Sequence, residues 1–235
     1  MNRNKKITII TNFILVFILS TVATVCFLPE TIVPIYGGTK IEAIYNGNRQ
    51  KKCVSLMFNV YENANVVNSI IDVLDQYNVK ATFFVGGCWA DDNGECLNKM
   101  KTSGHEIANH GYFHKDHAKI SYDKNREEIY LTEKIVQALC GVKTSLFAPP
   151  LGSFSAGTLE VANQLGYKVI MWSKDTIDWR DSNKELIIKR ATQNLTNGDL
   201  ILMHPKEHTL LALSEILSYY INNGFNVVTV SQCIE

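Results

Sequence analysis

Two histidines set four positions apart could hold a metal ion. His110 and His114 stand in the segment HGYFH, directly after an apolar segment that ends at Asn109. A single helical turn would put both imidazoles on one face, and this spacing suits a divalent ion such as zinc. Such a pair also arises by chance, as surface or core histidines. Its place at a predicted strand end favours the metal site, because chemistry in α/β proteins gathers there.

A third histidine could act as an acid or a base. His204 ends the apolar segment DLILMH and is followed by Pro205. An imidazole titrates near neutral pH, so a histidine in this place can give a proton to a leaving group. The alternative is a packed histidine that is hydrogen-bonded to the backbone.

The segment SLMFNVYEN departs from what a hydrolytic site needs. It is typical of a buried strand that breaks into a polar loop, but its first polar residue there is the amide Asn59, followed by Val60. Neither side chain can act as a base. Glu62 lies in the same loop, and a turn could bring its carboxylate to a metal ion or a water. Alternatively, Glu62 is a solvated acid or a favourable charge before the helix that begins near Asn65.

The elements that must position these side chains alternate between short apolar strands and amphipathic helices. Strands are predicted within 53–58, 80–87, 105–110, 144–152, 167–173, 199–205 and 225–231, and helices within 63–78, 95–104, 121–141, 155–166, 183–198 and 206–224. Ser121 is the predicted N-cap of the long helix, and Gly141 ends it. About seven strand–helix repeats predict an α/β fold in which a parallel sheet closes into a (β/α)7–8 barrel.

In such a barrel the site lies at the carboxyl ends of the strands. Titratable, aromatic and turn residues recur at the carboxyl ends of successive predicted strands. Randomly scattered surface charges would not show this regular placement. These residues are Asn59, Glu62, Trp89, His110, His114, Pro149, Pro150, Gly152, Asp175, Asp178, Trp179, Leu202 and His204.

The order FNVYEN, ATFFVGG, GHEIANHGYFH, FAPPLG, DTIDW and LILMHP resembles the NodB-type polysaccharide deacetylases, carbohydrate esterase family 4, over residues 53–235. The resemblance implies a distorted (β/α) barrel with a divalent metal, most readily zinc. It also implies removal of N-acetyl groups from amino sugars of peptidoglycan or chitin. The cell-wall glycan is then the partner.

The resemblance also implies roles for individual residues. His110 and His114 match the two metal-binding histidines, and His204 matches the general acid, with Leu202 in the same motif. Pro149, Pro150 and Gly152 belong to a groove wall in which Ala148 replaces an arginine. Asp175, Asp178 and Trp179 match the motif whose acid holds that arginine. Asn59 stands at the place of the base, and Val60 at the place of the third metal ligand.

These departures leave two hypotheses open. Two histidines are fewer than the three protein ligands of a catalytic zinc site, and Asn59 cannot accept a proton. The loss of the arginine at Ala148 is consistent with the loss of its carboxylate partner. The chain is then either a hydrolase with altered activity, assisted by Glu62 or Asp178, or an inactive relative that binds glycan. Trp89, Tyr112, Phe154 and Trp179 could stack on sugar rings in either case.

The first residues predict an anchored, exported protein. Residues 1–6 carry three basic side chains and no acid, and residues 7–28 carry no charge. Such a run spans about 33 Å, the thickness of a bilayer core, and its basic flank should stay in the cytoplasm. We predict a single-pass anchor over 7–28, with a signal peptide cleaved after Ala23 as the alternative. Residues 29–52 would form a linker to an extracellular domain over 53–235.

Composition narrows the partners further. Basic and acidic side chains both number 23, which gives no sign of nucleic-acid binding, and we expect a monomer. Six cysteines are present. Cys88 and Cys96 flank a short polar segment and could close a disulfide loop, although free buried thiols fit the spacings equally well.

Overall fold

The computed structural model describes residue 5, residues 12–20 and residues 41–235. Residues Ile41–Glu235 form one compact unit. This unit starts within the segment 29–52 that the sequence predicts as a linker. Residues 12–20 are helical, and in the described ranges we find no helix that is both long and apolar enough to cross a membrane. Most of the predicted anchor, residues 7–28, lies outside the described residues.

A single sheet of parallel ladders forms the centre of the compact unit, as predicted. Its order is β5-β4-β3-β2-β1-β7-β6, and β8 pairs with the start of β1. The strands are β1 (Cys53–Val60), β2 (Thr82–Val85), β3 (Glu106–Asn109), β4 (Leu146–Phe147), β5 (Lys168–Val169), β6 (Lys174–Asp175), β7 (Asp199–Met203) and β8 (Asn226–Val227).

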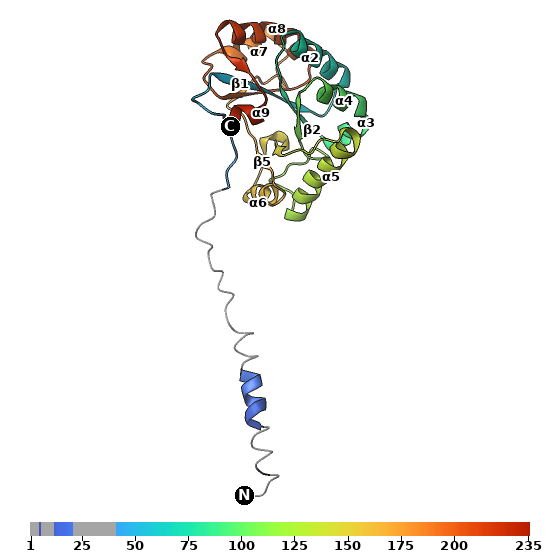
Figure 1. Ribbon diagram of the computed structural model, residues 1–235, viewed down its shortest axis with the longest axis vertical. Coiled ribbons are helices and arrows are strands. Elements are labelled where there is room, and N and C mark those ends of the chain that lie inside the picture. The colour runs from blue at the N-terminus through green and yellow to red at the C-terminus, as the bar shows by residue number, and fades with distance from the viewer. Residues whose placement is uncertain (1–4, 6–11, 21–40) are drawn as a thin grey trace. The chain divides into compact units, whose positions relative to one another are not determined.

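Helices cover the outside of the sheet. Figure 1 shows α7, α8 and α2 along one flank, with α4, α3, α5 and α6 following around the unit, and each neighbouring pair is in contact. The helices are α2 (Ala64–Gln76), α3 (Gly87–Asp92), α4 (Gly94–Thr102), α5 (Tyr122–Cys140), α6 (Ala156–Gln164), α7 (Lys184–Thr192), α8 (Glu207–Asn222) and α9 (Val230–Ile234).

Strand β1 is buried on both faces, and this fixes where its last side chains point. Successive side chains of a strand point to opposite faces. Phe58 and Val60 pack into the cluster between the sheet and the helices, whereas Met57 packs into the cluster inside the barrel. Asn59 therefore faces the inside of the barrel, and Val60 faces the helices.

Local signals place the ends of the helices well. The Ser121 hydroxyl accepts the backbone N–H of Lys124, and Gly141 takes the left-handed conformation with φ of 69°. Towards the C-terminus the prediction is only half right. The expected strand over 225–231 is limited to β8, because Thr229 and Gln232 form a reciprocal capping box that starts α9.

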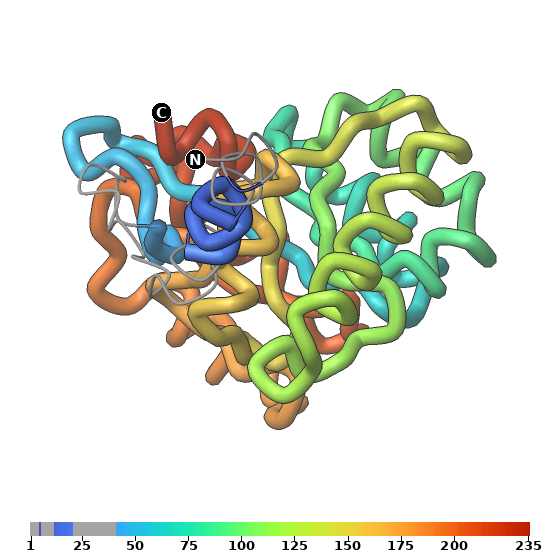
Figure 2. The backbone as a smooth tube through the Cα atoms, turned by 90° about the horizontal axis from the view of Figure 1, so that it is seen from below, coloured from blue at the N-terminus to red at the C-terminus, as the bar shows by residue number. Residues whose placement is uncertain are grey.

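The sheet curls into an incompletely closed barrel. Its edge strands are β5 and β6, and no ladder joins these two strands in the described part of the chain. The segment after Ile41 joins the region after β5 to the start of β7. Ile44 bridges to Ile170 after β5, and Asn46 bridges to Asp199 at the start of β7. Figure 2 shows this segment beside the C-terminal residues.

Candidate active-site pocket

A pocket of about 520 Å³ opens at the carboxyl ends of the strands, where the barrel predicts the site. Each wall comes from the end of a strand or from the loop that follows it. The lining residues are Asn59, Tyr61, Glu62, His110, His114, Leu151, Gly152, Trp172, Asp175, Trp179, Leu202, His204 and Lys206.

His110 and His114 meet in this pocket with ring centroids 5.2 Å apart. The helical turn invoked for their spacing is wrong, because the segment forms an irregular loop in which His114 has a left-handed φ of 54°. His110 Nδ1–H donates to the Ala148 carbonyl at 2.7 Å in the tautomer that this contact requires. Burial, with the neighbouring His114, lowers the pKa of His110 to about 3. Burial also lowers the pKa of His114. Both rings are therefore neutral near pH 7.

The loop that carries the two histidines is held from below by buried polar side chains. The Glu128 carboxylate, which is 6% exposed, accepts the backbone N–H groups of Tyr112 and Phe113, each at 2.7 Å. Asn109 Oδ1 accepts the N–H of Gly111 at 2.9 Å. These contacts hold the histidine pair without a regular helix.

His204 forms a carboxylate–histidine dyad with Asp178. Its Nδ1–H donates to Asp178 Oδ1 at 2.7 Å, which leaves the other ring nitrogen for the pocket. Asp178 Oδ2 accepts the His204 N–H at 2.7 Å and the Thr209 hydroxyl at 2.6 Å. Burial would raise the pKa of Asp178, but the hydrogen bonds and the charge of His204 outweigh it and hold the pKa below its usual value. Asp178 does not line the pocket itself, because its carboxylate is 1% exposed and orients His204.

The place expected for the base holds a buried amide. Asn59 is 6% exposed, lines the pocket, and its Oδ1 has no hydrogen-bond partner among the described residues. Val60 is fully buried and packs against the helices, so its side chain lies away from the pocket. Asp175 does line the pocket, where it accepts the Ile177 N–H at 2.7 Å and the Trp179 indole N–H at 3.5 Å.

Glu62 reaches the pocket but does not replace the missing carboxylates. Its carboxylate forms an ion pair with Lys206 across the pocket wall. Among the described residues, no group of three or more His, Cys, Asp or Glu side chains is arranged to hold a metal ion. The two histidines therefore stand without the third protein ligand that a catalytic zinc site requires. The side chains present do not fit the metal centre that the resemblance implies.

The remaining predicted substrate-binding residues divide into two groups. Gly152, Trp179 and Leu202 line the pocket, and Trp179 is 55% exposed at its rim. The other predicted contacts do not belong to the lining of this pocket. Trp89 is 7% exposed within the core beneath the helices, and Tyr112 packs edge-on against Phe113. Pro149, Pro150 and the aromatic Phe154 do not belong to the pocket lining either.

A family model described as polysaccharide deacetylase matches residues 46–170, more than half of the chain. The chain belongs to the polysaccharide deacetylase family. It is 32% identical over 194 residues to YlxY of Bacillus subtilis, covering 83% of this chain and 61% of that protein. It thus spans about three-fifths of that relative. It is also 31% identical over 191 residues to a peptidoglycan-N-acetylglucosamine deacetylase of Bacillus cereus, covering 79% of this chain and 70% of that enzyme.

One solved structure of the same fold bears on activity. BA3943 of Bacillus anthracis, described as a CE4 family pseudoenzyme, matches with a TM-score of 0.81 and 29% identity. The match covers 84% of this chain and 70% of that one. A BA3943 mutant described as having restored enzymatic activity matches with the same TM-score at 28% identity, over 84% of this chain and 72% of that one. The polysaccharide deacetylase fold therefore occurs both in active deacetylases and in a pseudoenzyme.

This polysaccharide deacetylase homologue also has pocket residues that sequence reasoning missed, namely Tyr61, Leu151, Trp172 and Lys206. Tyr61 lies 5.0 Å from the His114 ring, and burial raises the pKa of its phenol to about 12. Leu151 is 70% exposed and has a left-handed φ of 60°. Each of these residues follows a strand by only a few positions, so their place after predicted strand ends was the available signal.

Proposed function

We propose that this protein binds strands of N-acetylated cell-wall amino sugars, as in peptidoglycan, and hydrolyses their amide bonds poorly or not at all. The observation that carries the proposal is Asn59 at the place of the general base, while the described residues hold no cluster of three metal-ligating side chains around the histidine pair. Similarity to the peptidoglycan-N-acetylglucosamine deacetylase of Bacillus cereus supports a cell-wall glycan as the ligand. Similarity to the BA3943 pseudoenzyme supports the loss of turnover.

Hydrolysis of an acetamide needs a base for the attacking water and an acid for the leaving nitrogen. The acid half is intact, because Asp178 orients His204 and can stabilise its protonated form. The base half is missing, because the Asn59 amide accepts a hydrogen bond but not a proton. A general base typically contributes a factor of about 10²–10⁴ to the rate. We therefore expect turnover to fall by at least this factor.

Binding does not need the lost groups. The pocket volume of about 520 Å³ lies in the range typical of small-ligand sites, about 300–1,000 Å³. Trp179 and Leu151 expose apolar surface at the rim, where the flat face of a sugar ring can pack. Asn59 Oδ1 is a buried acceptor without a partner and could take an N–H or O–H group of a bound sugar.

A second candidate function is slow hydrolysis by an altered mechanism, favoured by the intact dyad of His204 and Asp178. A site without any catalytic use would not need a buried carboxylate that is fully hydrogen-bonded to its histidine.

The test compares binding with turnover in the full chain, purified in a mild detergent. We expect chitooligosaccharides or peptidoglycan fragments to bind, while acetate release stays at the level of a His204→Asn control. The zinc content measured by mass spectrometry should be below one ion per chain. Efficient acetate release that Glu62→Gln abolishes would overturn the proposal in favour of the hydrolase. Absence of glycan binding in a folded protein would overturn both candidates.

Restoring the expected residues provides the complementary test. A variant with Asn59→Asp, Val60→Asp and Ala148→Arg should gain acetate release when zinc is added. Asn59→Asp is also tested alone, because Val60 is fully buried and an acid at that place can unfold the strand end. Circular dichroism confirms folding of each variant before activity is compared.

We also propose that residues 7–28 anchor the domain on the outer side of the membrane and that the protein is a monomer. The charge-free run behind a basic flank supports this orientation. Protease added to intact cells should digest the domain, and protection of the domain would refute the orientation. Light scattering of the purified chain tests the monomer.

A further inference from the structure

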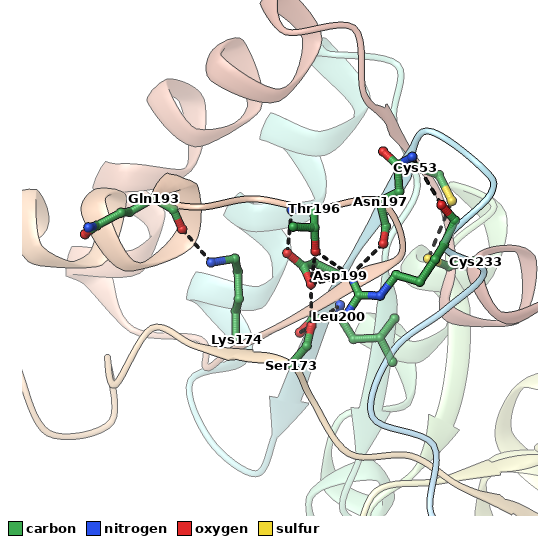
Figure 3. Close-up of polar contacts among 10 residues, drawn as sticks. Cys53, Ser173, Lys174, Gln193, Thr196, Asn197, Asp199, Leu200 and Cys233 are labelled. Atoms are coloured by element: carbon green, nitrogen blue, oxygen red, sulfur yellow. Dashed lines mark hydrogen bonds and ion pairs between the residues drawn. The ribbon is translucent and has the colours of Figure 1, made fainter.

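Two cysteines touch at the end of the barrel opposite the pocket. Cys53 begins β1, and Cys233 lies in α9. Their sulfur atoms are 3.6 Å apart, and the residues are 5% and 0% exposed. Figure 3 shows the two side chains beside the polar contacts around Asp199. Asn59 stands at the other end of β1, so this pair is separate from the site described above.

The backbone around Cys233 is held in place from several sides. Its carbonyl accepts the Asn48 N–H at 2.7 Å, and a Cβ atom at Gly47 would lie 2.6 Å from its sulfur. The Val230 N–H, at the start of α9, donates to the Thr82 hydroxyl at 2.7 Å. The contact between the two sulfurs is therefore fixed by the packing and hydrogen bonds of the surrounding backbone.

The buried carboxylate of Asp199, near the cysteine pair, holds the segments around it by hydrogen bonds. Arg49 donates to Asp199 Oδ1 at 2.9 Å, and the Ser173 hydroxyl donates to the same oxygen at 2.9 Å. Asp199 Oδ2 accepts the Thr196 N–H at 2.8 Å (Figure 3). These contacts fix the segments around Arg49 and Asp199 beside the cysteine pair.

We propose that Cys53 and Cys233 form a disulfide that links the first strand of the sheet to the last helix. A disulfide needs the sulfurs at about 2.05 Å, so side-chain rotation must bring them closer by roughly 1.5 Å from their 3.6 Å contact. The pair that the sequence offers as an alternative, Cys88 and Cys96, makes other contacts. Cys96 lies against the Ala64 carbonyl, and Cys88 interacts with Tyr61.

The reaction is thiol–disulfide exchange with a small-molecule or protein disulfide as the oxidant. With oxidised glutathione, the two cysteines lose two electrons and two protons and become joined, while the glutathione disulfide is cleaved to two thiols. Burial raises the pKa of the Cys233 thiol, with Cys53 as a further cause, so its reactive thiolate is scarce in the folded protein. The bond should therefore form during folding and resist reductants afterwards.

The bond would close a loop between positions 180 apart in the sequence, nearly the whole compact unit. Closing a long loop restricts the unfolded chain and so stabilises the folded one. For a domain of this size we expect reduction to lower the Tm by about 5–15 °C.

The test uses the full chain, unfolded in urea with reductant and refolded in a glutathione redox buffer. We expect a mass lower by about 2 Da, the loss of two thiol hydrogens, and one crosslinked peptide pair containing Cys53 and Cys233. The matched control, Cys88→Ser with Cys96→Ser, should keep both the crosslink and the Tm difference. Cys233→Ala should have the same Tm in oxidising and reducing buffer.

Three results would overturn the proposal. They are complete alkylation of Cys53 and Cys233 after oxidative refolding, a crosslink between Cys88 and Cys96 instead, and equal Tm values for the oxidised and the reduced wild-type chain.

Discussion

Acidification from pH 7.5 to 5.0 should destabilise the domain sharply, because three histidines are buried in their neutral form. His105, His110 and His117 are 6%, 1% and 0% exposed. Burial is the largest cause that lowers their pKa values, to about 4, about 3 and about 4 respectively. His117 Nδ1–H donates to Asn125 Oδ1 at 2.7 Å, and His105 Nδ1 accepts the Ala81 N–H at 3.3 Å.

The sign and size of the effect follow from proton binding. A histidine in an unfolded chain titrates near pH 6.5. The stability is therefore fully present above about pH 6.5, and it falls as the pH drops toward about 4, since only the unfolded state takes up the protons. At pH 5.0 each histidine costs about 2 kcal/mol, from roughly 1.5 pH units at about 1.4 kcal/mol per unit. Three histidines cost about 6 kcal/mol, comparable to the whole stability of a typical domain, about 5–15 kcal/mol.

Urea unfolding at the two pH values measures this loss, with a chelator in both buffers to keep ions off the pocket histidines. His105→Asn and His117→Asn place an amide atom near the position of Nδ1. Each variant should be less stable than the wild type at pH 7.5, but should lose about 2 kcal/mol less between pH 7.5 and 5.0. Equal wild-type stabilities at the two pH values, or variants that retain the full loss, would refute the assignment of these imidazoles as buried and neutral.

Three further substitutions test how the pocket is built. Glu128→Gln should lower the free energy of unfolding by about 1–3 kcal/mol, because two N–H groups of the histidine loop lose a charged acceptor. The control Glu127→Gln, at an exposed position, should change it by less than about 0.5 kcal/mol. Urea titrations measure both changes. Gly86→Ala should cost about 1–3 kcal/mol, since the new Cβ would lie 2.1 Å from the Tyr61 ring; an unchanged Tm would contradict this contact. Lys206→Met breaks the half-exposed ion pair with Glu62 and should alter the free energy of unfolding by less than about 1 kcal/mol. Glycan binding measured by calorimetry should become weaker. A larger loss of stability would show that Lys206 has a structural role.

The order of strands and helices could be predicted because its signals are local. Apolar periodicity, the Ser121 cap and the Gly141 terminator each act within a few residues, and the parallel ladders follow from the regular alternation. The end of the chain was harder, since the run from Phe225 to Ser231 has strand-forming residues but contains a capping box. The helix α9 begins there because satisfying backbone N–H groups outweighs β propensity.

Pairings between distant residues could not be predicted in the same way. The hydrogen bond of Asp178 to His204 depends on which side of its loop faces β7. Glu62 pairs with Lys206, which lies 144 positions away in the sequence. Trp89 is a residue type that often stacks on sugar rings, yet the path of α3 turns its ring into the core. Such directions follow from packing, and a residue's type and place along the chain do not reveal them.

The sequence by itself determined the family, the strand ends that surround the pocket, the histidine pair, and the amide Asn59 at the place where a base was expected, because motif order and residue identity are properties of the chain. Only the tertiary structure decided that, within the described part of the chain, no third metal-ligating side chain joins the two histidines, that Asp178 orients His204, and that Cys53 contacts Cys233. The physical reason is that hydrogen bonds, ion pairs and sulfur contacts act over a few ångströms. The curl of the sheet alone brings the ends of β1, β7 and α9 within that range.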